Sequence, residues 1–339
     1  MVTIYDVAKR AGVSAATVSR VFSGQARVAP GRAEAVRQAA EELGFIPNRN
    51  ARRLRTSSSE IIAMMVPDIA NPFFTLMTRA VEDVARTAGY SVMLCNTDED
   101  FEREQEYLRV AASEPVAGIV MVPTATSRLD WALDRQVPVV CVDRHAGDYA
   151  VDAVVADNYN SAAAATRLLY AAGYERPACI TGPEHIETSN QRLAGWSQVV
   201  RERSGSDPDP ELILRAQYVL DEDGERAAHQ LLSLPHPPDA IFAANNRLAT
   251  GTLRALARLQ LMPPAVGLVS FGDPPQMLFL PSGIIITYLP SRDMGTTAAR
   301  MLLERINGLD APARSITLPV GLEQSHDEDA PAVPTTDTK

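Results

Sequence analysis

From residue 61 onward, the chain alternates between short apolar runs and longer stretches whose apolar residues recur at helical spacing. Continuous apolar runs are typical of strands buried in a parallel sheet, and the stretches between them predict helices covering both faces. About 260 residues of this α/β pattern fit two doubly wound parallel-sheet lobes better than one sheet. The predicted strands are IIAMMVP, SVMLC, AGIVMV, VPVVCVD, DAVVAD, PACITG, AIFAA, VGLVSF and IIITY. The predicted helices span about 72–88, 101–113, 126–135, 158–172, 190–203, 223–234, 246–260 and 292–307.

The first 46 residues have a different pattern, which is helical throughout. Gly12 can adopt the positive φ of a tight turn, and Ser14 is a good N-cap for the helix that follows. Pro30 stands at or just before the start of a third helix, and Gly44 is a C-terminal stop. Two short helices joined by a tight turn, with a third packed across them, form an all-α helix-turn-helix. The three predicted helices span 4–11, 15–22 and 31–43.

Charge is distributed unevenly along the chain. The formal net charge is -10, yet residues 1–60 hold ten Lys or Arg and only five Asp or Glu. A small basic head on an acidic body is expected of a module that binds phosphates. Within the head, the segment NRNARRLRTSSS at 48–59 has four arginines and no acid, so it repels itself too strongly to fold alone. It is either a basic solvated linker or a segment that orders on DNA.

Three stretches of the sequence closely resemble the LacI/GalR (lactose-repressor) family of bacterial transcription regulators. They are TIYDVAKRAGVSAATVSRVF, VRQAAEELGFIPNRNARRLRT and VPDIANPFF, in the order that the family has them. A weaker resemblance continues through GPEHIETSNQRLAGW, AIFAANN and LVSFGD to about residue 323. The resemblance implies a repressor that binds near-palindromic operator DNA as a homodimer and is controlled allosterically by a small molecule.

The DNA contacts expected from this pattern lie on the second helix and in the basic segment. Small side chains at the start of that helix let its backbone approach base edges, and Arg20 is the candidate for a guanine contact. The resemblance implies a hinge helix in the basic segment, with Leu54 as a wedge in the minor groove. The predicted DNA-binding residues are Tyr5, Ser14, Ala15, Ala16, Thr17, Ser19, Arg20, Asn48, Arg49, Ala51, Arg52, Leu54 and Arg55.

For the body, the resemblance implies a periplasmic-binding-protein-like fold whose ligand lies between the lobes. Lobe one would comprise about 61–158 and 290–320, and lobe two about 159–288, with three crossings between them. Ligands in such folds sit at the carboxyl ends of the strands. The predicted effector-binding residues are Phe73, Phe74, Asp143, Thr188, Arg192, Tyr218, Asn245 and Asp273.

Each cleft candidate also has a structural interpretation. Phe74 can belong to the core, and a strand-end acid or Arg192 can belong to an ion pair within one lobe. If they line the cleft, aromatic faces mixed with polar groups suit a sugar or sugar derivative, with a nucleobase second. The chain departs from the family's usual Asn-Asp at Asn245-Asn246, and its ending LEQSHDED also differs. We therefore divide the chain into a helix-turn-helix domain at 1–46, a hinge at 47–60, the two-lobed effector-binding and dimerisation domain at 61–323 and a disordered tail at 324–339.

Other classes of protein find little support in the sequence. It has no GxSxG, Walker, HExxH or GxGxxG motif, its five His lack metal-ligand spacing, and its three Cys lack CxxC pairing. We therefore expect no enzyme, cofactor or metal. A solute-binding protein of a transport system is the alternative, although the basic head and the lack of a signal peptide oppose it. With no membrane-spanning run either, a cytoplasmic location is expected.

Overall fold

The computed structural model describes residues 2–23, 28–45, 59–113, 116–217, 221–274 and 283–324. The chain divides into two compact units, Met1–Ser59 and Glu60–Lys339. The hinge candidates Asn48, Arg49, Ala51, Arg52, Leu54 and Arg55, as well as Tyr218 and the tail from 325 onward, lie outside the described residues. Within the described ranges, no helix is long and apolar enough to cross a membrane.

The N-terminal unit contains the three helices that the sequence predicts, α1 (Ile4–Ala11), α2 (Ala15–Ser23) and α3 (Pro30–Leu43). Gly12 has a φ of 64°, and the Ser14 hydroxyl accepts a hydrogen bond from the Thr17 amide at 3.2 Å, so the predicted turn and N-cap are confirmed. One buried valine from each helix, Val7, Val18 and Val36, belongs to the shared core. The head is therefore a helix-turn-helix with a hydrophobic core of its own.

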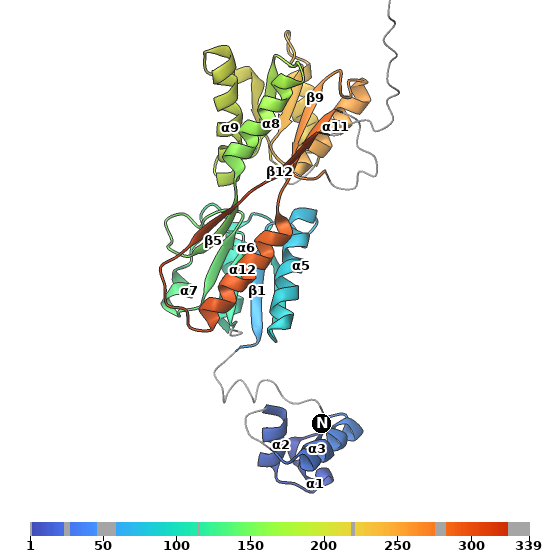
Figure 1. The fold of residues 1–339 in the computed structure, drawn as a ribbon, viewed down its shortest axis with the longest axis vertical. Coiled ribbons are helices and arrows are strands. Elements are labelled where there is room, and N and C mark those ends of the chain that lie inside the picture. Colours follow the sequence, from blue (N-terminus) through green and yellow to red (C-terminus); the bar gives the residue numbers. More distant parts are fainter. Residues whose placement is uncertain are drawn as a thin grey trace, which may run out of the picture. The chain divides into compact units, whose positions relative to one another are not determined.

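Lobe one of the body is a six-stranded parallel sheet with helices packed on it (Figure 1). Its elements are β1 (Ile61–Val66), α5 (Pro72–Thr87), β2 (Ser91–Asn96), α6 (Phe101–Ser113), β3 (Gly118–Met121), α7 (Asp130–Asp134), β4 (Val139–Val142), β5 (Asp152–Ala156), α12 (Ser291–Ile306) and β11 (Ser315–Leu318). The strand order is β11-β5-β4-β3-β1-β2. All of these strands pair in parallel.

Lobe two repeats this architecture. Its elements are α8 (Asn158–Ala171), β6 (Pro177–Thr181), α9 (Glu187–Ser204), a 3₁₀ turn (Pro210–Leu212), β7 (Ile213–Arg215), α10 (Asp221–Leu232), β8 (Ala240–Ala243), α11 (Asn246–Leu259), β9 (Gly267–Phe271), β10 (Ile284–Tyr288) and β12 (Gly321–Gln324). The order is β12-β10-β9-β8-β6-β7, in which only the edge strand β12 is antiparallel to its neighbour. The predicted fold class is confirmed.

The described chain crosses between the lobes after β5, after β10 and after β11, as predicted. Three edge strands, β7, β11 and β12, were missed because they are short and partly or largely exposed, so they lack a continuous apolar run. Gln324, which we assigned to the tail, belongs to β12 and pairs with Ile285 of β10.

One predicted helix is shorter than expected, and a buried carboxylate explains the difference. The helix expected at 126–135 spans only Asp130–Asp134. The side chain of Glu104 accepts hydrogen bonds from the Thr124 amide at 2.7 Å and the Ser127 hydroxyl at 2.6 Å. These bonds hold the residues before α7 in a loop.

Asp152, the first residue of β5, binds two arginines from the C-terminal part of lobe one. Its carboxylate is fully buried and accepts hydrogen bonds from Arg305 at 2.8 and 2.9 Å and from the Arg314 amide at 2.8 Å. Burial alone would raise the pKa of Asp152, but the bonds from Arg305 and Arg314 outweigh it and lower the pKa to about 2. The charged form of Asp152 therefore stabilises the fold.

We predict that Asp152→Asn lowers the free energy of unfolding by about 3 kcal/mol at pH 7, because two arginines lose their buried counter-charge. A lowered pKa gives stability that is present above the ordinary pKa of 3.8 and lost as pH falls towards 2. The deficit should therefore shrink between pH 5 and pH 3 in urea unfolding curves. Asp134→Asn, at an exposed position of α7, is the control. A deficit that does not change with pH would contradict the prediction.

Candidate functional site

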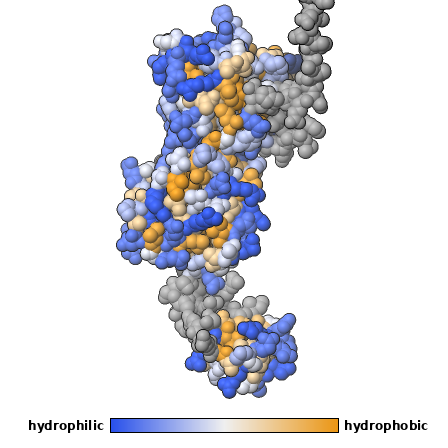
Figure 2. Space-filling model, viewed as in Figure 1, coloured by the Kyte–Doolittle hydropathy of each residue, from blue (hydrophilic) through white to orange (hydrophobic). Residues whose placement is uncertain are grey.

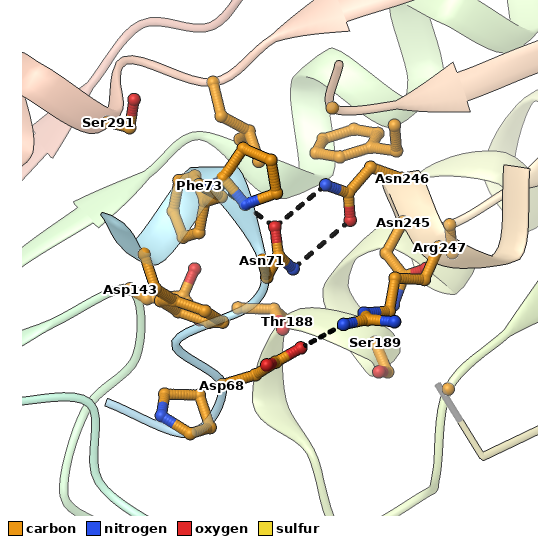
Figure 3. A pocket seen from close by; sticks show the side chains of 18 of the residues that line it. Asp68, Asn71, Phe73, Asp143, Thr188, Ser189, Asn245, Asn246, Arg247 and Ser291 are labelled. Atoms are coloured by element: carbon orange, nitrogen blue, oxygen red, sulfur yellow. Dashed lines mark hydrogen bonds and ion pairs between the residues drawn. The ribbon is translucent and has the colours of Figure 1, made fainter. Parts of the chain in front are cut away.

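A cavity lies between the two lobes of the body. Its volume is about 140 Å³, whereas one water needs only ~10–15 Å³ by the same measure. Its polar lining follows the carboxyl ends of strands in both sheets, where α/β folds place their ligands. These residues are Asp68, Asn71, Asp98, Glu99, Asp143, Arg144 and Ser291 from lobe one, and Thr188, Ser189, Arg192, Asn245, Asn246, Arg247 and Asp273 from lobe two. Figure 3 shows many of them converging on the cavity.

On the lobe-one side, buried charges of both signs are joined in a short chain. Arg144 donates hydrogen bonds to both carboxylate oxygens of Glu99, at 3.0 and 2.7 Å, and lies 3.5 Å from the carboxylate of Asp143. Burial raises the pKa of Asp143, and the charges of Arg144 and Arg192 oppose that rise. Asp98, Glu99 and Asp143 all have positive φ, a conformation that costs energy outside glycine and often occurs at functional sites.

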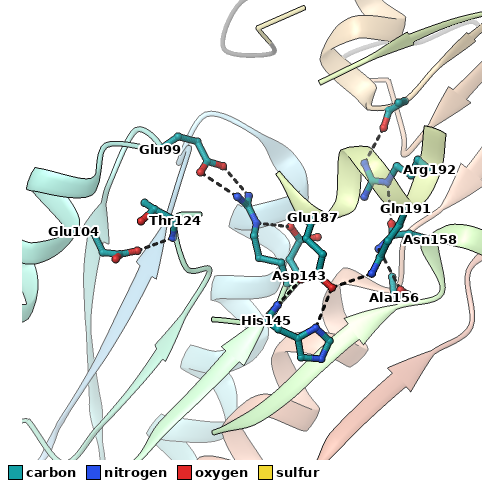
Figure 4. A network of polar contacts seen from close by, with 12 residues as sticks. Glu99, Glu104, Thr124, Asp143, His145, Ala156, Asn158, Glu187, Gln191 and Arg192 are labelled. Carbon is teal, nitrogen blue, oxygen red and sulfur yellow. Dashed lines mark hydrogen bonds and ion pairs between the residues drawn. The ribbon is translucent and has the colours of Figure 1, made fainter. Parts of the chain in front are cut away.

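On the lobe-two side, Arg192 of α9 is held rigidly (Figure 4). It is only 6% exposed, its Nε donates to Asn158 Oδ1 at 2.8 Å, and its Nη1 donates to the carbonyl of Ala244 at 2.7 Å. Its guanidinium lies 4.3 Å from the ring centre of Phe271, a cation–π contact. These partners all belong to lobe two and carry no carboxylate. Arg192 therefore lines the cavity with its geometry set in advance.

The two adjacent phenylalanines at the start of α5 differ in exposure. Phe74 is only 8% exposed and belongs to the core of lobe one, so core packing accounts for most of its surface. Phe73 is half-buried, and its ring meets that of Phe74 edge-on at 5.0 Å. Both line the cavity, but Phe73 offers the larger free face.

The remaining predicted cleft residues have distinct positions. Thr188 is buried in the first turn of α9. Asn245 caps α11, because its side chain accepts a hydrogen bond from the Leu248 amide at 2.8 Å. Asp273 stands exposed at the edge of the cavity, and the protein around it raises its pKa by partial desolvation.

Sequence reasoning missed several polar residues of the cleft. Arg144 directly follows Asp143, and Asp68 and Asn71 follow the first strand of the body, so the strand-end rule used for Asp143 would have found them. Asn246 was noted only as a departure from the family. Across the cavity, Asn71 exchanges two hydrogen bonds with Asn246, at 2.9 and 3.3 Å, and Asp68 accepts one from Arg247 at 2.7 Å.

In the head, the predicted DNA-binding residues that the structure describes differ in their exposure. Tyr5 of α1 is 74% exposed, and Ser14, Ala16 and Arg20 are also exposed. Thr17 and Ser19 are half-buried. Ala15 is half-buried too and packs against the core of the head, so its small side chain also serves the fold.

Together, the fold and the cleft define a class of protein: a helix-turn-helix head joined to a two-lobed ligand-binding body. Comparisons with known proteins agree. Residues 3–48 match the bacterial regulatory proteins of the lacI family, and residues 59–326 match the periplasmic binding proteins and sugar binding domain of the LacI family. The chain therefore belongs to the LacI family and is a DNA-binding transcription regulator, not a transport protein. The family consists of regulators rather than enzymes.

Individual relatives match over most of their length. The ribose operon repressor of Halalkalibacterium halodurans is 35% identical over 90% of this chain and 91% of that protein. Among solved structures, the lac repressor dimer bound to operator and the anti-inducer ONPF has a TM-score of 0.82 at 25% identity, covering 96% of this chain and 98% of that one. The transcriptional regulator CelR in complex with cellobiose has a TM-score of 0.71 at 26% identity, covering 96% and 99%.

We predict that Arg144→Gln lowers the free energy of unfolding by about 3 kcal/mol, because Glu99 loses the arginine that it pairs with and Asp143 loses the nearer of two positive charges. The pKa of Asp143 should then rise further. A raised pKa gives stability that is lost as pH increases, so the deficit should be larger at pH 8 than at pH 5. Urea unfolding at both pH values measures it, with Arg109→Gln on the exposed face of α6 as control. Equal deficits in Arg144→Gln and its control would refute the prediction.

Proposed function

We propose that this protein is an effector-controlled transcriptional repressor that binds operator DNA as a homodimer and a neutral sugar between its lobes. The observation that carries the proposal is a polar cleft in which Arg144 is paired with Glu99 and Asp143, and Arg247 with Asp68, in a body joined to a helix-turn-helix head. As a regulator that acts on DNA, it would work in the cytoplasm. The cleft would bind its ligand without converting it, as in a family of regulators.

The paired charges of the cleft favour an uncharged ligand. Glu99 and Asp143 flank Arg144, and Asp68 pairs with Arg247, so an ionic ligand would have to displace these partners. The half-exposed ring of Phe73 suits the apolar face of a sugar, while the fixed donors of Arg192 suit its hydroxyl groups. The relatives include a ribose operon repressor and a cellobiose-bound regulator, which supports a carbohydrate.

For the head, we propose that Arg20 reads a guanine and that Tyr5, Thr17 and Ser19 bind phosphates. An arginine can donate two hydrogen bonds to the major-groove edge of guanine, whereas phosphate contacts position a protein without reading sequence. Ser14, Ala15 and Ala16 would allow close approach to the bases. The proposed hinge contacts are Asn48, Arg49, Ala51, Arg52, Leu54 and Arg55.

The homodimer is supported by surface chemistry as well as by the family. Lobe one has an apolar hollow lined by residues that include Val66, Ile69, Phe74 and Leu94. Ile69 and Leu94 are 47% and 46% exposed, and Figure 2 shows apolar side chains on the surface of this lobe. Exposed apolar side chains such as these are available to pack against a second subunit. The matching lac repressor structure is a dimer on its operator.

We predict that Arg20→Ala flattens the preference among operator sequences and leaves weak, salt-sensitive binding to any DNA. Losing a guanine contact should cost ~1–3 kcal/mol of discrimination. A binding assay with a randomised site measures the preference. Arg32→Ala, which removes the same charge from an exposed position of α3, should weaken DNA binding without changing its selectivity. Unchanged selectivity in Arg20→Ala would contradict the assigned role.

We predict that Arg192→Lys raises the sugar concentration needed to change operator binding at least tenfold. Lysine keeps the charge but lacks the planar guanidinium, which donates to Asn158 and to the Ala244 carbonyl at the same time. Operator-binding titrations against a panel of pentoses, hexoses, disaccharides, nucleosides and purines make the measurement. Arg167→Lys, at an exposed ion pair of α8, is the control. A normal response from Arg192→Lys would make this arginine structural, and a response to purines alone would replace the sugar.

A further inference from the structure

Two asparagines join the lobes across the mouth of the cleft. Asn71 immediately precedes α5 in lobe one, and Asn246 is the first residue of α11 in lobe two. Asn246 Nδ2 donates to Asn71 Oδ1 at 2.9 Å, and Asn71 Nδ2 donates to Asn246 Oδ1 at 3.3 Å (Figure 3). The side chains thus form a reciprocal amide pair between segments 175 residues apart.

The direction of this pair is dictated by the helix cap. Asn71 Oδ1 also accepts a hydrogen bond from the Phe73 amide at 3.1 Å, which fixes the oxygen of Asn71 towards α5. Its partner must therefore present a donor to that oxygen. An asparagine at position 246 has one, whereas an ionised aspartate has only acceptors.

This requirement explains a departure from the family noted in the sequence. The resemblance leads one to expect aspartate at position 246, and a carboxylate at the first position of a helix is favoured by the helix dipole. The chain has Asn246 instead, which forgoes that benefit and gains the donor that Asn71 needs. The next residue, Arg247, also reaches lobe one, where its Nη2 lies 2.7 Å from Asp68.

We propose that Asn71 and Asn246 form an amide clasp that holds the lobes closed in the absence of effector, with Asp68 and Arg247 as a flanking ion pair. The clasp sets the ligand-free balance between closed and open lobes. Because apparent affinity scales with the population of the binding-competent state, the clasp also raises affinity for a ligand that fits the closed cleft. This deepens the proposed function, since it names what joins the lobes before an effector arrives.

The distance between the lobes can be measured on the full-length protein without DNA or sugar. Spin labels at Arg109→Cys in α6 and Gln230→Cys in α10, in dimers assembled with an excess of unlabelled parent, would report the distance across the lobes of one subunit, since both positions are exposed. The native Cys95, Cys141 and Cys179 are buried and should not be labelled. Pulsed electron–electron double resonance then gives the distribution of distances between the labels.

Three variants test the clasp at graded strength. Asn246→Asp and Asn71→Asp each remove one hydrogen bond of the pair, and Asn71→Asp keeps an acceptor for the Phe73 amide. Each should shift part of the population to a distance absent or minor in the parent. The double variant opposes two carboxylates, so its shift should exceed the sum of the single shifts. Asn307→Asp adds the same charge at an exposed position after α12 and should shift nothing.

The outcomes separate the clasp from its alternatives. Parental distances in Asn246→Asp and in the double variant, with folding verified by circular dichroism, would overturn the proposal. The proposal would also be overturned if the lobes opened fully in Arg247→Gln and not at all in Asn246→Asp, because the ion pair would then be the main connection between the lobes. Since sugar and DNA are absent, a failure to find a sugar effector would leave the distance result standing, and the two proposals can fail separately.

Discussion

The carboxyl ends of two parallel sheets face one another across the cleft, and the chemistry of the body depends on this arrangement. At these ends the backbone leaves the sheet, helices begin, and polar side chains meet around a cavity. A charge buried there must find a partner or be neutralised, by gaining a proton if it is a carboxylate and by losing one if it is a cation. Lobe one meets this demand with Glu99, Arg144 and Asp143, and lobe two with the hydrogen bonds of Arg192.

Many contacts between the lobes are polar, although Leu289 packs against an apolar cluster of each lobe, and each lobe has its own apolar cores on the two faces of its sheet. Besides the pairs at the mouth of the cleft, the backbone amide of His145 donates to Glu187 in lobe two at 2.8 Å (Figure 4). Apolar packing resists sliding, but a few hydrogen bonds can be exchanged for water at modest cost. Such lobes can move as rigid bodies about their three crossings, which a ligand-controlled switch requires.

The accuracy of the predicted elements depended on their burial. Nine strands and the long helices were predicted from the sequence, because burial on both faces selects continuous apolar runs such as IIAMMV in β1. SITL in β11 has a mixed composition and gave no signal, whereas the edge strand β2 was predicted because SVMLC contains an apolar run. The short α7 is limited by the side chain of Glu104, which is 20 residues distant from Thr124 along the chain.

By itself, the sequence determined the helix-turn-helix, the two-lobed α/β body, the family and several of the strand ends that line the cleft, because local periodicity, caps and strand ends are written in neighbouring residues. Only the tertiary structure decided what those strand-end side chains contact. It showed that Phe74 is mostly core, that Asn245 caps a helix and that Asn246 meets Asn71 across the cleft. Such partners lie far apart along the chain, and the pairing of polar groups depends on distances that no local pattern records.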